Sequence, residues 1–457
     1  MVRNFIAGIF IVLEVMFCTT FSYASELESS DKTEEFRTDV LSQFITPGHS
    51  LGDLRRGVID AQPVISKVIE RFGQVTLPCG QYRIDEPFGN WSKDGIRLSG
   101  VSTGCVNINV TFSMSRETPA LFYLSGHYQT ISNLTIVAKK KMSSGAAIYL
   151  KYVSGTHLHD LVVTGPFWNG VYIYGSNNVH LDHIYGRPPF LDGEDIPNPQ
   201  NGAAFAGNGF ITLDGNKENG KINIDTYISN VNIAQYKYGI NYIYASGVYC
   251  DGIDVVGAKN GHIFTPGEGE NVNGIQMVNV LGDTSFDANW FFPKSGGGVF
   301  DLLCTNCWAS SSYNGAGVEI ENYRSSQVNF LNSISLNNAQ SGLKIGGGNQ
   351  ISWVGGAIEM NNTKLNNNRY DSPDVSISGE EGSLDWLRIQ DIFIGQGGIM
   401  HTLYHKKNQA TYAIDVSAVP SLTHVLISNI QTSGHILGVV KLPADKSNIL
   451  VSNVIGN

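Results

Sequence analysis

The sequence predicts an all-β fold, a single solenoid of short parallel strands with a small helical cap at its N-terminal end. Three observations predict this class. The tetrapeptide Ile-Ser-Asn-apolar, or Val-Ser-Asn-Val in its last copy, occurs at residues 131–134, 228–231, 427–430 and 451–454. Looser copies fill the gaps at steps of mostly 22 to 27 residues, and apolar and polar residues alternate within each unit. Such a repeat is typical of coils that stack and bury one another's faces.

The composition fits a turn-rich repeat protein better than a disordered or membrane protein. The 457 residues include 51 Gly, and 15% are charged while 42% are hydrophobic. An average globular chain has about 25% charged residues and about 7% Gly. The formal net charge is -10, from 30 Lys and Arg against 40 Asp and Glu. This balance argues against a nucleic-acid partner held by a basic surface.

The first 24 residues look like an export signal. Arg3 supplies the positive start, residues 5–17 are mostly apolar, and Ser22-Tyr23-Ala24 offers small residues for cleavage after Ala24. We therefore expect a secreted or periplasmic protein, with residues 25–49 as a linker. A membrane span needs roughly 20 apolar residues, and no later segment of the sequence has them.

Residues 50–100 are expected to form the cap and the first strands, before coils that occupy residues 101–457. Apolar residues recur at helical spacing from Asp53 to Phe72, and Gly57 and Pro63 should divide this segment into two pieces. Two strand-like segments follow, at residues 75–84 and 96–100. The whole range 50–457 is thus predicted to be one domain.

The first apolar residue of each repeat serves as a marker of the inward side, and these markers predict about 12 coils. The step of 47 residues from Leu181 to Ile228 indicates a missed turn plus an insertion, and two other long steps indicate loops of about a dozen residues. The Asn of each repeat is expected to stack at a tight turn. The markers are Ile131, Leu158, Leu181, Ile228, Cys250, Met277, Leu303, Phe330, Trp353, Ile389, Ile427 and Val451.

Most units carry a second strand that begins with Gly. Clear examples are residues 170–173, 209–212, 239–242, 317–320 and 342–345. Units of this length have no room for helices, so short strands separated by Asn and Gly turns should coil into a parallel β-helix whose coils lie about 4.8 Å apart.

Residues 75–84 (VTLPCGQYRI), preceded by the helix and followed by the strand IRLSG at 96–100, carry a family pattern. This order resembles the start of right-handed β-helix proteins of the pectate lyase superfamily, which includes polygalacturonases, pectate lyases, alginate epimerases and phage tailspike depolymerases. The resemblance covers about residues 50–457 and implies a single-stranded right-handed parallel β-helix. It also implies a polysaccharide bound across the sheet of Gly-led strands, although one scaffold hosts many chemistries.

Two carboxylates on a Gly-led strand are the candidate catalytic residues. Alternation in residues 318–321 directs Glu319 and Glu321 outward, with Cα atoms about 6.5 to 7 Å apart, near the spacing of an acid and base pair in glycoside hydrolysis. Lys344 follows Glu319 by 25 residues, one coil, and is expected to bind substrate and to hold Glu319 ionised, which leaves Glu321 as the acid. Asp287, from the adjacent coil, is the third catalytic candidate. The alternative is a solvated surface pair.

Four more residues are expected to bind substrate, because aromatic faces stack on sugar rings and polar groups bond to their hydroxyls. They are Tyr172, Asn241, Trp290 and Asp214. The alternative for the aromatic residues is a ladder that only stabilises the sheet. Asp214 begins a candidate loop at 214–219, and a second loop at 187–208 carries three further acidic residues.

The sequence departs from the motifs of the superfamily in ways that leave the reaction open. The Asp-Asp and Gly-His-Gly motifs of polygalacturonases and the Asp-Pro-His-Asp motif of alginate epimerases are absent, and no cluster of calcium ligands is evident. Four histidines on neighbouring coils, His157, His159, His180 and His183, are interpreted as structural or surface residues. We therefore expect no metal and no cofactor.

Five cysteines remain after signal cleavage, so they cannot all pair within the chain. Cys79 and Cys105 are one coil apart and could form a disulfide. Cys304 and Cys307 could close a small loop or stay reduced. Cys250 occupies a marker position and is interpreted as a buried free thiol.

Three hypotheses of function follow. The first is an exported polysaccharide-degrading enzyme, a glycoside hydrolase that uses Glu319, Glu321 or Asp287. The second is a polysaccharide lyase, in which Lys344, Arg324 or a Tyr acts on a uronic acid. The third is a non-catalytic glycan-binding or surface protein. A solenoid with an open C-terminal end could also pair with another copy of itself, so a homo-oligomer is a further expectation.

Overall fold

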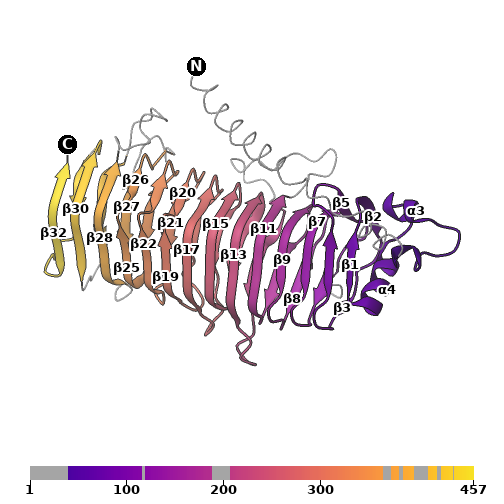
Figure 1. Cartoon of the computed structure of the whole chain (residues 1–457). Coiled ribbons are helices and arrows are strands. Elements are labelled where there is room, and N and C mark those ends of the chain that lie inside the picture. The colour runs from indigo at the N-terminus through magenta and orange to yellow at the C-terminus, as the bar shows by residue number, and fades with distance from the viewer. Residues whose placement is uncertain are drawn as a thin grey trace, which may run out of the picture.

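The computed structural model describes residues 40–115, 119–187, 206–363, 372–379, 384–395, 410–418, 424–435 and 437–456. These residues form one row of stacked β-coils with two helices at its N-terminal end (Figure 1). The expected signal peptide and the linker up to residue 39 lie outside the described residues. In the described part, no helix is long and apolar enough to cross a membrane.

Two short helices cover the N-terminal end of the solenoid, as the sequence predicts. Helix α3 (Leu51–Arg55) begins with a capping box between Ser50 and Asp53, and helix α4 (Gln62–Phe72) ends at Gly73, which has a φ of 71°. Both helices are brief because Gly57 leaves the helical conformation and Pro63 is accepted only in the first turn. The apolar face of α4 packs on the core of the first coil and buries Val64, Ile65, Val68 and Ile69.

One wall of the solenoid is a 13-stranded parallel sheet, here called the short-strand sheet. All five segments predicted as Gly-led strands lie in it. The expectation of about 12 coils is close to this number, and the marker series omits the two described coils before Ile131, at residues 74–84 and 97–110. In spatial order the strands are β3 (Asn90–Trp91), β6 (Ala120–Leu124), β8 (Ala146–Lys151), β10 (Asn169–Tyr174), β12 (Ala206–Asp214), β14 (Tyr236–Tyr242), β16 (Asn260–Phe264), β18 (Trp290–Phe292), β21 (Val318–Ile320), β24 (Leu343–Ile345), β27 (Val375–Ser378), β29 (Tyr412–Ala418) and β31 (Gly438–Lys441).

The rest of each coil belongs to a second parallel sheet of 19 strands, here called the long-strand sheet. In some coils the chain crosses this sheet as one bent strand, and in others as two successive strands. They are β1 (Gln74–Leu77), β2 (Gly80–Ile84), β4 (Arg97–Gly100), β5 (Val106–Val110), β7 (Thr130–Ala138), β9 (His157–Thr164), β11 (Asn177–Arg187), β13 (Asn223–Ala234), β15 (Ala245–Val256), β17 (Val272–Asp283), β19 (Val299–Thr305), β20 (Trp308–Ser310), β22 (Ser326–Leu331), β23 (Ile334–Leu336), β25 (Gly348–Val354), β26 (Ala357–Glu359), β28 (Leu384–Gly395), β30 (Val425–Ser433) and β32 (Ile449–Gly456).

The bend within the long strands lies at one residue per coil, and these residues stack in a column, the Asn corner. All have left-handed backbone, which Asn and Gly tolerate best. Their side chains also bond between coils: Asn453 Nδ2 donates to Asn429 Oδ1 at 3.0 Å, and Asn429 Nδ2 donates to Asp391 Oδ1 at 2.7 Å. The predicted stacking of the repeated Asn is confirmed. The column consists of Asn133, Asp160, His183, Asn230, Gly252, Asn279, Asn306, Asn332, Gly355, Asp391, Asn429 and Asn453.

Two details of the predicted repeat are wrong. Cys304, not Leu303, stands between Met277 and Phe330 in the inward column, and Leu303 is 38% exposed. Strand β11 pairs directly with β13, so the 47-residue step contains one coil with an insertion and no missed turn. The first error arises because period-two alternation leaves two registers open when both neighbouring residues are apolar. The second arises because the length of a step does not distinguish an extra turn from an insertion.

The interior is a continuous column of apolar and aromatic side chains. Tyr242, Phe264 and Phe292 stack on one another across three coils, with ring centroids 4.6 and 4.2 Å apart. Disulfides join Cys79 to Cys105, on adjacent coils, and Cys304 to Cys307, while Cys250 is a buried free thiol. The sequence left the state of these two pairs open, and in the structure both pairs are disulfides.

Strands β31 and β32 are the last of their sheets within the described residues, at the yellow end of Figure 1. Their inward side chains Val440, Val451 and Val454 are only half-buried, unlike those of earlier coils. An edge of this kind can pair with another strand. Formation of a homo-oligomer stays a prediction.

The interior also holds one histidine whose titration should govern stability in acid. His262 is fully buried, stacks on Trp290 with centroids 4.4 Å apart, and donates through Nε2 to the carbonyl of Leu281 at 3.4 Å. Burial lowers the pKa of His262 from 6.5 to about 4. Because the unfolded chain takes up this proton near pH 6.5 and the folded chain does not, folding stability is lost as the pH falls between these values, by at most about 1.4 kcal/mol per pH unit.

We therefore predict that His262→Phe, which keeps a ring in the stack but cannot titrate, flattens this loss. Thermal melts of both proteins at pH 7, 6, 5 and 4 provide the measurement. The melting temperature of the parent protein should fall more steeply than that of the variant below pH 6.5. Parallel curves for the two proteins would contradict the assignment.

Candidate functional site

The outer face of the short-strand sheet carries one column of side chains, fixed by the strand register. Its first members are aromatic and its later members are charged, so the two kinds of group occupy different stretches of one wall. Alternation places them outward because their strand neighbours, such as Val318 and Ile320, are buried. The column reads Tyr123, Tyr149, Tyr172, Thr212, Asn241, Ile263, Phe291, Glu319, Lys344, Ser376, Asp415 and Lys441.

Glu319, Glu321 and Lys344 form a cluster on this face, as the sequence predicts. Strand β21 supplies both carboxylates, and Lys344 of β24 is the register partner of Glu319. Lys344 Nζ donates to Glu319 Oε1 and also to Glu321 Oε1, at 3.2 Å from the latter. The Glu319 side chain is 14% exposed, whereas those of Glu321 and Lys344 are about twice as open, at 32% and 31%. The cluster is therefore partly buried, with Glu319 its deepest member.

Burial decides the electrostatics of Glu319. Desolvation raises the pKa of the Glu319 carboxyl, the nearby Lys344 ammonium offsets part of this rise, and the neighbouring Glu321 carboxyl raises the pKa further through repulsion and a hydrogen bond. For Lys344, burial lowers the pKa, but the attraction of both carboxylates outweighs burial and leaves the pKa raised. The net rise in the pKa of Glu319 runs against the expectation that Lys344 holds this carboxyl ionised, although Lys344 does lower the pKa. Which of the two carboxyls acts as the acid stays a prediction.

One cation joins the two carboxylates, because both contact the same Lys344 nitrogen. Retaining glycosidases place their two carboxyl groups about 5 to 5.5 Å apart, and inverting ones about 6.5 to 9.5 Å. In this structure both carboxylates of the candidate pair are therefore occupied by an ion pair with Lys344.

A shallow groove of about 510 Å³ adjoins the cluster, where the chain leaves the short-strand sheet. Tyr323 and Arg324 enter it two and three residues after Glu321, and Arg324 donates to Tyr323 Oη at 3.1 Å and to the carbonyl of Gly296 at 3.0 Å. The groove brings two cations and one carboxylate close to the cluster. Its lining is Glu268, Lys294, Ser295, Gly296, Tyr323 and Arg324.

Sequence reasoning missed Glu268 and Lys294 in this groove. The available signal was the pair of triple-glycine runs, Gly296–Gly298 and Gly346–Gly348, each of which directly follows a strand of the short-strand sheet or its turn. A Cβ on Gly347 would lie 3.0 Å from the backbone of Tyr323, so only glycine lets the next coil pack there. These runs leave the turns narrow, and the groove remains open above them.

Tyr172 and Asp214, both predicted to bind substrate, lie in contact on the short-strand sheet. Tyr172 Oη donates to Asp214 Oδ2, and burial followed by the Asp214 charge raises the pKa of the Tyr172 hydroxyl. Tyr149 stands between Tyr123 and Tyr172, stacked on the first with centroids 5.1 Å apart and edge-on to the second at 5.2 Å. This group lies several coils from Glu319. It forms a partly exposed aromatic patch whose rings already contact one another.

Three other predicted site residues do not lie where a substrate could meet the cluster. Trp290 is fully buried and points inward, because the outward position of β18 belongs to Phe291, so the prediction that it binds substrate is wrong. Asn241 faces outward but is only 5% exposed and accepts from Thr265 Oγ1 at 2.7 Å. Asp287 precedes β18 and pairs with Lys259 at 3.5 Å, away from Glu319 and Glu321.

The histidines lie on the long-strand sheet, as expected. His157 stands against His180 of the next coil with centroids 5.7 Å apart, and His159 bonds to Asp160 at 2.8 Å. Among the described residues, no three His, Cys, Asp or Glu side chains are arranged to hold a metal ion. Of the insertion at 187–208, residues 188–205 lie outside the described residues.

The architecture defines the fold class: the chain is a right-handed parallel β-helix. A tailspike protein of bacteriophage CBA120, tailspike protein 3, superposes with a TM-score of 0.59 at 10% identity, over 94% of this chain and 64% of that one, less than two thirds of its length. The similarity shows the fold, which confirms the resemblance found in the sequence.

Two further solved structures align with TM-scores below 0.5. They are the mannuronan C-5 epimerase A-module of Azotobacter vinelandii (0.46, 13% identity, 88% of this chain and 97% of that one) and PfbA, a surface adhesin of Streptococcus pneumoniae (0.46, 13% identity, 88% and 89%). No protein-family model and no curated protein sequence matches the chain.

The cluster predicts a pH-dependent effect of removing its cation. In Lys344→Met, both carboxylates of β21 lose their partner, which should lower the free energy of unfolding at pH 7 by about 1 to 3 kcal/mol. The loss should shrink at pH 4, because the raised pKa of Glu319 means that this carboxyl is then protonated and needs no cation. Chemical denaturation at both pH values measures the difference.

Lys441→Met is the matched control. Lys441 occupies the same outward column and pairs with Asp415 at 3.0 Å, but its side chain is 45% exposed, so its removal should have a smaller effect, below about 1 kcal/mol. Equal losses for Lys344→Met at pH 7 and pH 4 would contradict the coupled cluster.

Proposed function

We propose that this chain is an exported enzyme that degrades a polysaccharide by hydrolysis, with Glu319 as general acid and Glu321 as base or nucleophile. The observation that carries this proposal is the outward carboxyl of Glu319, whose pKa is raised by burial beside a second, more exposed carboxylate. Two carboxyls whose environments separate their proton affinities suit acid and base roles. Export rests on residues 1–24, which lie outside the described residues.

A polysaccharide is supported as the partner by two features. The resemblance to the pectate lyase superfamily implies a sugar chain across the short-strand sheet. That sheet carries outward tyrosines in one stretch and the cluster in another, so an extended chain along the solenoid axis could contact both. The net charge of -10 gives no support to a nucleic-acid partner.

Hydrolysis requires a defined division of roles. The Glu319 carboxyl would donate its proton to the glycosidic oxygen as the bond to the anomeric carbon breaks. A water molecule would attack that carbon and give its proton to Glu321, or Glu321 would attack first and water would release the sugar. Either route needs both carboxyls accessible to substrate or water, and Lys344 contacts both of them. Substrate would therefore have to displace Lys344 from at least one of them, and the ammonium could then compensate the charge left on Glu319.

The runner-up is a polysaccharide lyase acting on a uronic acid. The observation that favours it is the groove beside the cluster, where Lys294 and Arg324 could neutralise a sugar carboxylate. Against it, the raised pKa of Lys344 makes that residue a poor base near neutral pH. The third candidate is a non-catalytic glycan-binding protein, favoured by the fact that Lys344 satisfies both carboxylates as a structural ion pair would.

We predict that Glu319→Gln and Glu321→Gln each lower turnover at least about 100-fold while binding of the same polysaccharide persists. A panel of neutral and acidic polysaccharides is digested and assayed for reducing ends and for ultraviolet absorbance of unsaturated products. Asp415→Asn, in the same column but paired with Lys441, is the control and should keep activity. Products that absorb in the ultraviolet would favour a lyase instead of a hydrolase. Binding of a polysaccharide without any product would favour the non-catalytic function.

The same roles predict the alkaline side of the pH profile. Glu319 must be protonated to act, so the hydrolysis rate should fall as the pH rises through its raised pKa. Since Lys344 lowers the pKa of Glu319, Lys344→Met should move this fall to higher pH. Profiles of kcat/KM for both proteins test the shift. A fall at the same or a lower pH in the variant would exclude Glu319 as the acid.

A further inference from the structure

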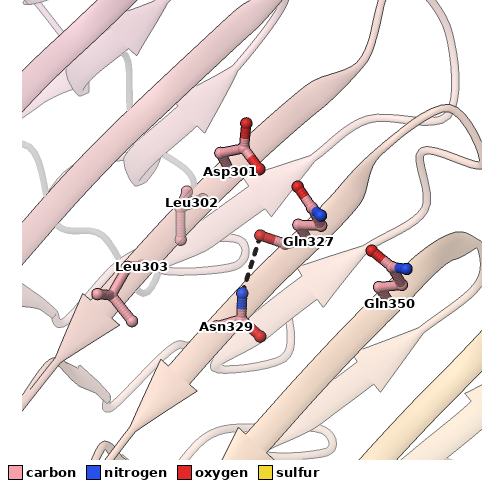
Figure 2. A pocket seen from close by; sticks show the side chains of 6 residues that line it. All are labelled: Asp301, Leu302, Leu303, Gln327, Asn329 and Gln350. Atoms are coloured by element: carbon pink, nitrogen blue, oxygen red, sulfur yellow. Dashed lines mark hydrogen bonds between the residues drawn. The ribbon is translucent and has the colours of Figure 1, made fainter.

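A second groove lies on the long-strand sheet, on a different wall from the cluster of Glu319. It has a volume of about 460 Å³ and runs over three neighbouring strands, β19, β22 and β25. Figure 2 shows side chains from these strands side by side along the groove. The lining residues are Asp301, Leu302, Leu303, Gln327, Asn329 and Gln350.

One rim of the groove is a second column of left-handed residues, here called the outer corner. The column begins with Tyr128, and in the five coils between it and the groove it consists of residues suited to this backbone, namely Gly155, Asn178, Asp225, Gly247 and Gly274. In the next four coils it consists of Asp301, Gln327, Gln350 and Trp386, with φ of 53°, 58°, 54° and 52°.

Glutamine and tryptophan are uncommon in this conformation, because their Cβ crowds the backbone where glycine would be relaxed. Among the described residues of this column, the bulky side chains recur in consecutive coils at the groove and just after it, at Gln327, Gln350 and Trp386, whereas Tyr128 (φ 55°) stands alone many coils earlier. Strain that recurs at one place is a pointer to function. What these residues provide, and glycine would not, is a row of side chains projecting at the rim.

The polar side chains of this row have no partner among the described residues. Asp301, Gln327 and Gln350 make no side-chain hydrogen bond there, although all are exposed. In contrast, Asn329 on the floor donates to the carbonyl of Gln327 at 3.1 Å (Figure 2). It also accepts from Ser352 Oγ at 2.5 Å. The floor is therefore ordered by the protein, while the rim offers amide donors and acceptors to a ligand.

Trp386 closes the row with an aromatic surface. It is 53% exposed, and one face of its indole stacks on His424 of the following coil, with centroids 4.1 Å apart. Trp386 follows Gln350 in the column, so it stands one coil beyond the residues that line the groove. Leu303, 38% exposed, adds an apolar patch to the floor.

We propose that this groove is a second carbohydrate-binding site, which holds a neutral polysaccharide along the outer corner without cleaving it. Amides bond to sugar hydroxyls, and an open indole face packs on a pyranose ring. No Lys or Arg lines the groove, and Asp301 would repel a uronate, so the ligand class is a neutral glycan. The site goes beyond the proposed hydrolysis at Glu319, and its binding does not depend on that reaction.

Substitution by glycine provides a test that spares the fold. Gln327→Gly, Gln350→Gly and Trp386→Gly, combined in one protein, remove the rim side chains while relieving their left-handed strain. The full chain and the triple variant are run in native gels cast with dextran, soluble β-glucan or galactomannan, and with alginate as an anionic comparison. The full chain should be retarded in at least one neutral gel, and the triple variant should bind that glycan at least about tenfold more weakly.

Two controls separate this site from its surroundings. Asp225→Gly makes the same type of change in the same column outside the groove and should keep the retardation. Lys441→Met should keep it as well, because Lys441 lies on the other sheet and outside the cluster of Glu319. Equal retardation of the triple variant, retardation by alginate alone, or no retardation in any neutral gel would each overturn the proposal.

Discussion

The corners of the coil are the constraint on which the rest of this structure depends. Each coil must change direction at a single residue in left-handed conformation, and the corners of successive coils must coincide for the strands between them to pair. Once the corners are stacked, alternation decides which side chains face the core and which face solvent. Both proposed sites follow from that arrangement, since each is a column of outward residues repeated at the coil spacing of about 4.8 Å.

The sequence predicted those features that depend on one coil or on its period. Alternation placed Glu319 and Glu321 outward, and the 25-residue step put Lys344 beside Glu319. It failed where two adjacent residues were both apolar, as at Leu303 and Cys304, or where a strand was all aromatic, as at Trp290, because neither face is then marked. The sequence also did not predict that the pKa of Glu319 is raised. Lys344 could be recognised in the sequence and lowers this pKa, but burial of Glu319, which the sequence does not show, has the larger effect. The outer-corner groove escaped notice because its signal is conformational: Gln327 and Gln350 are unremarkable in the sequence until their φ angles are known.

The two walls of the solenoid differ in the chemistry they offer. The short-strand sheet carries a cluster with one cation and two carboxylates, next to a groove with Lys294 and Arg324. The groove on the long-strand sheet has amides, one carboxylate and an indole nearby, and no cation in its lining. Because every outward column runs parallel to the axis, both surfaces suit a linear polymer better than a small compact ligand. The difference in charge between them means that they need not select the same polymer, or the same part of it.

If hydrolysis proceeds as proposed, the balance of charge within the cluster bears on how Glu319 would serve as an acid. One ammonium cannot fully compensate two carboxylates, and burial raises the pKa of the Glu319 carboxyl. A sugar bound over Glu319 would exclude more water from it, and displacement of Lys344 from Glu319 would remove the cation that lowers its pKa. Both changes would raise the proton affinity of Glu319 before any bond is broken. The energy needed to displace Lys344 would come from contacts made elsewhere along the sugar chain.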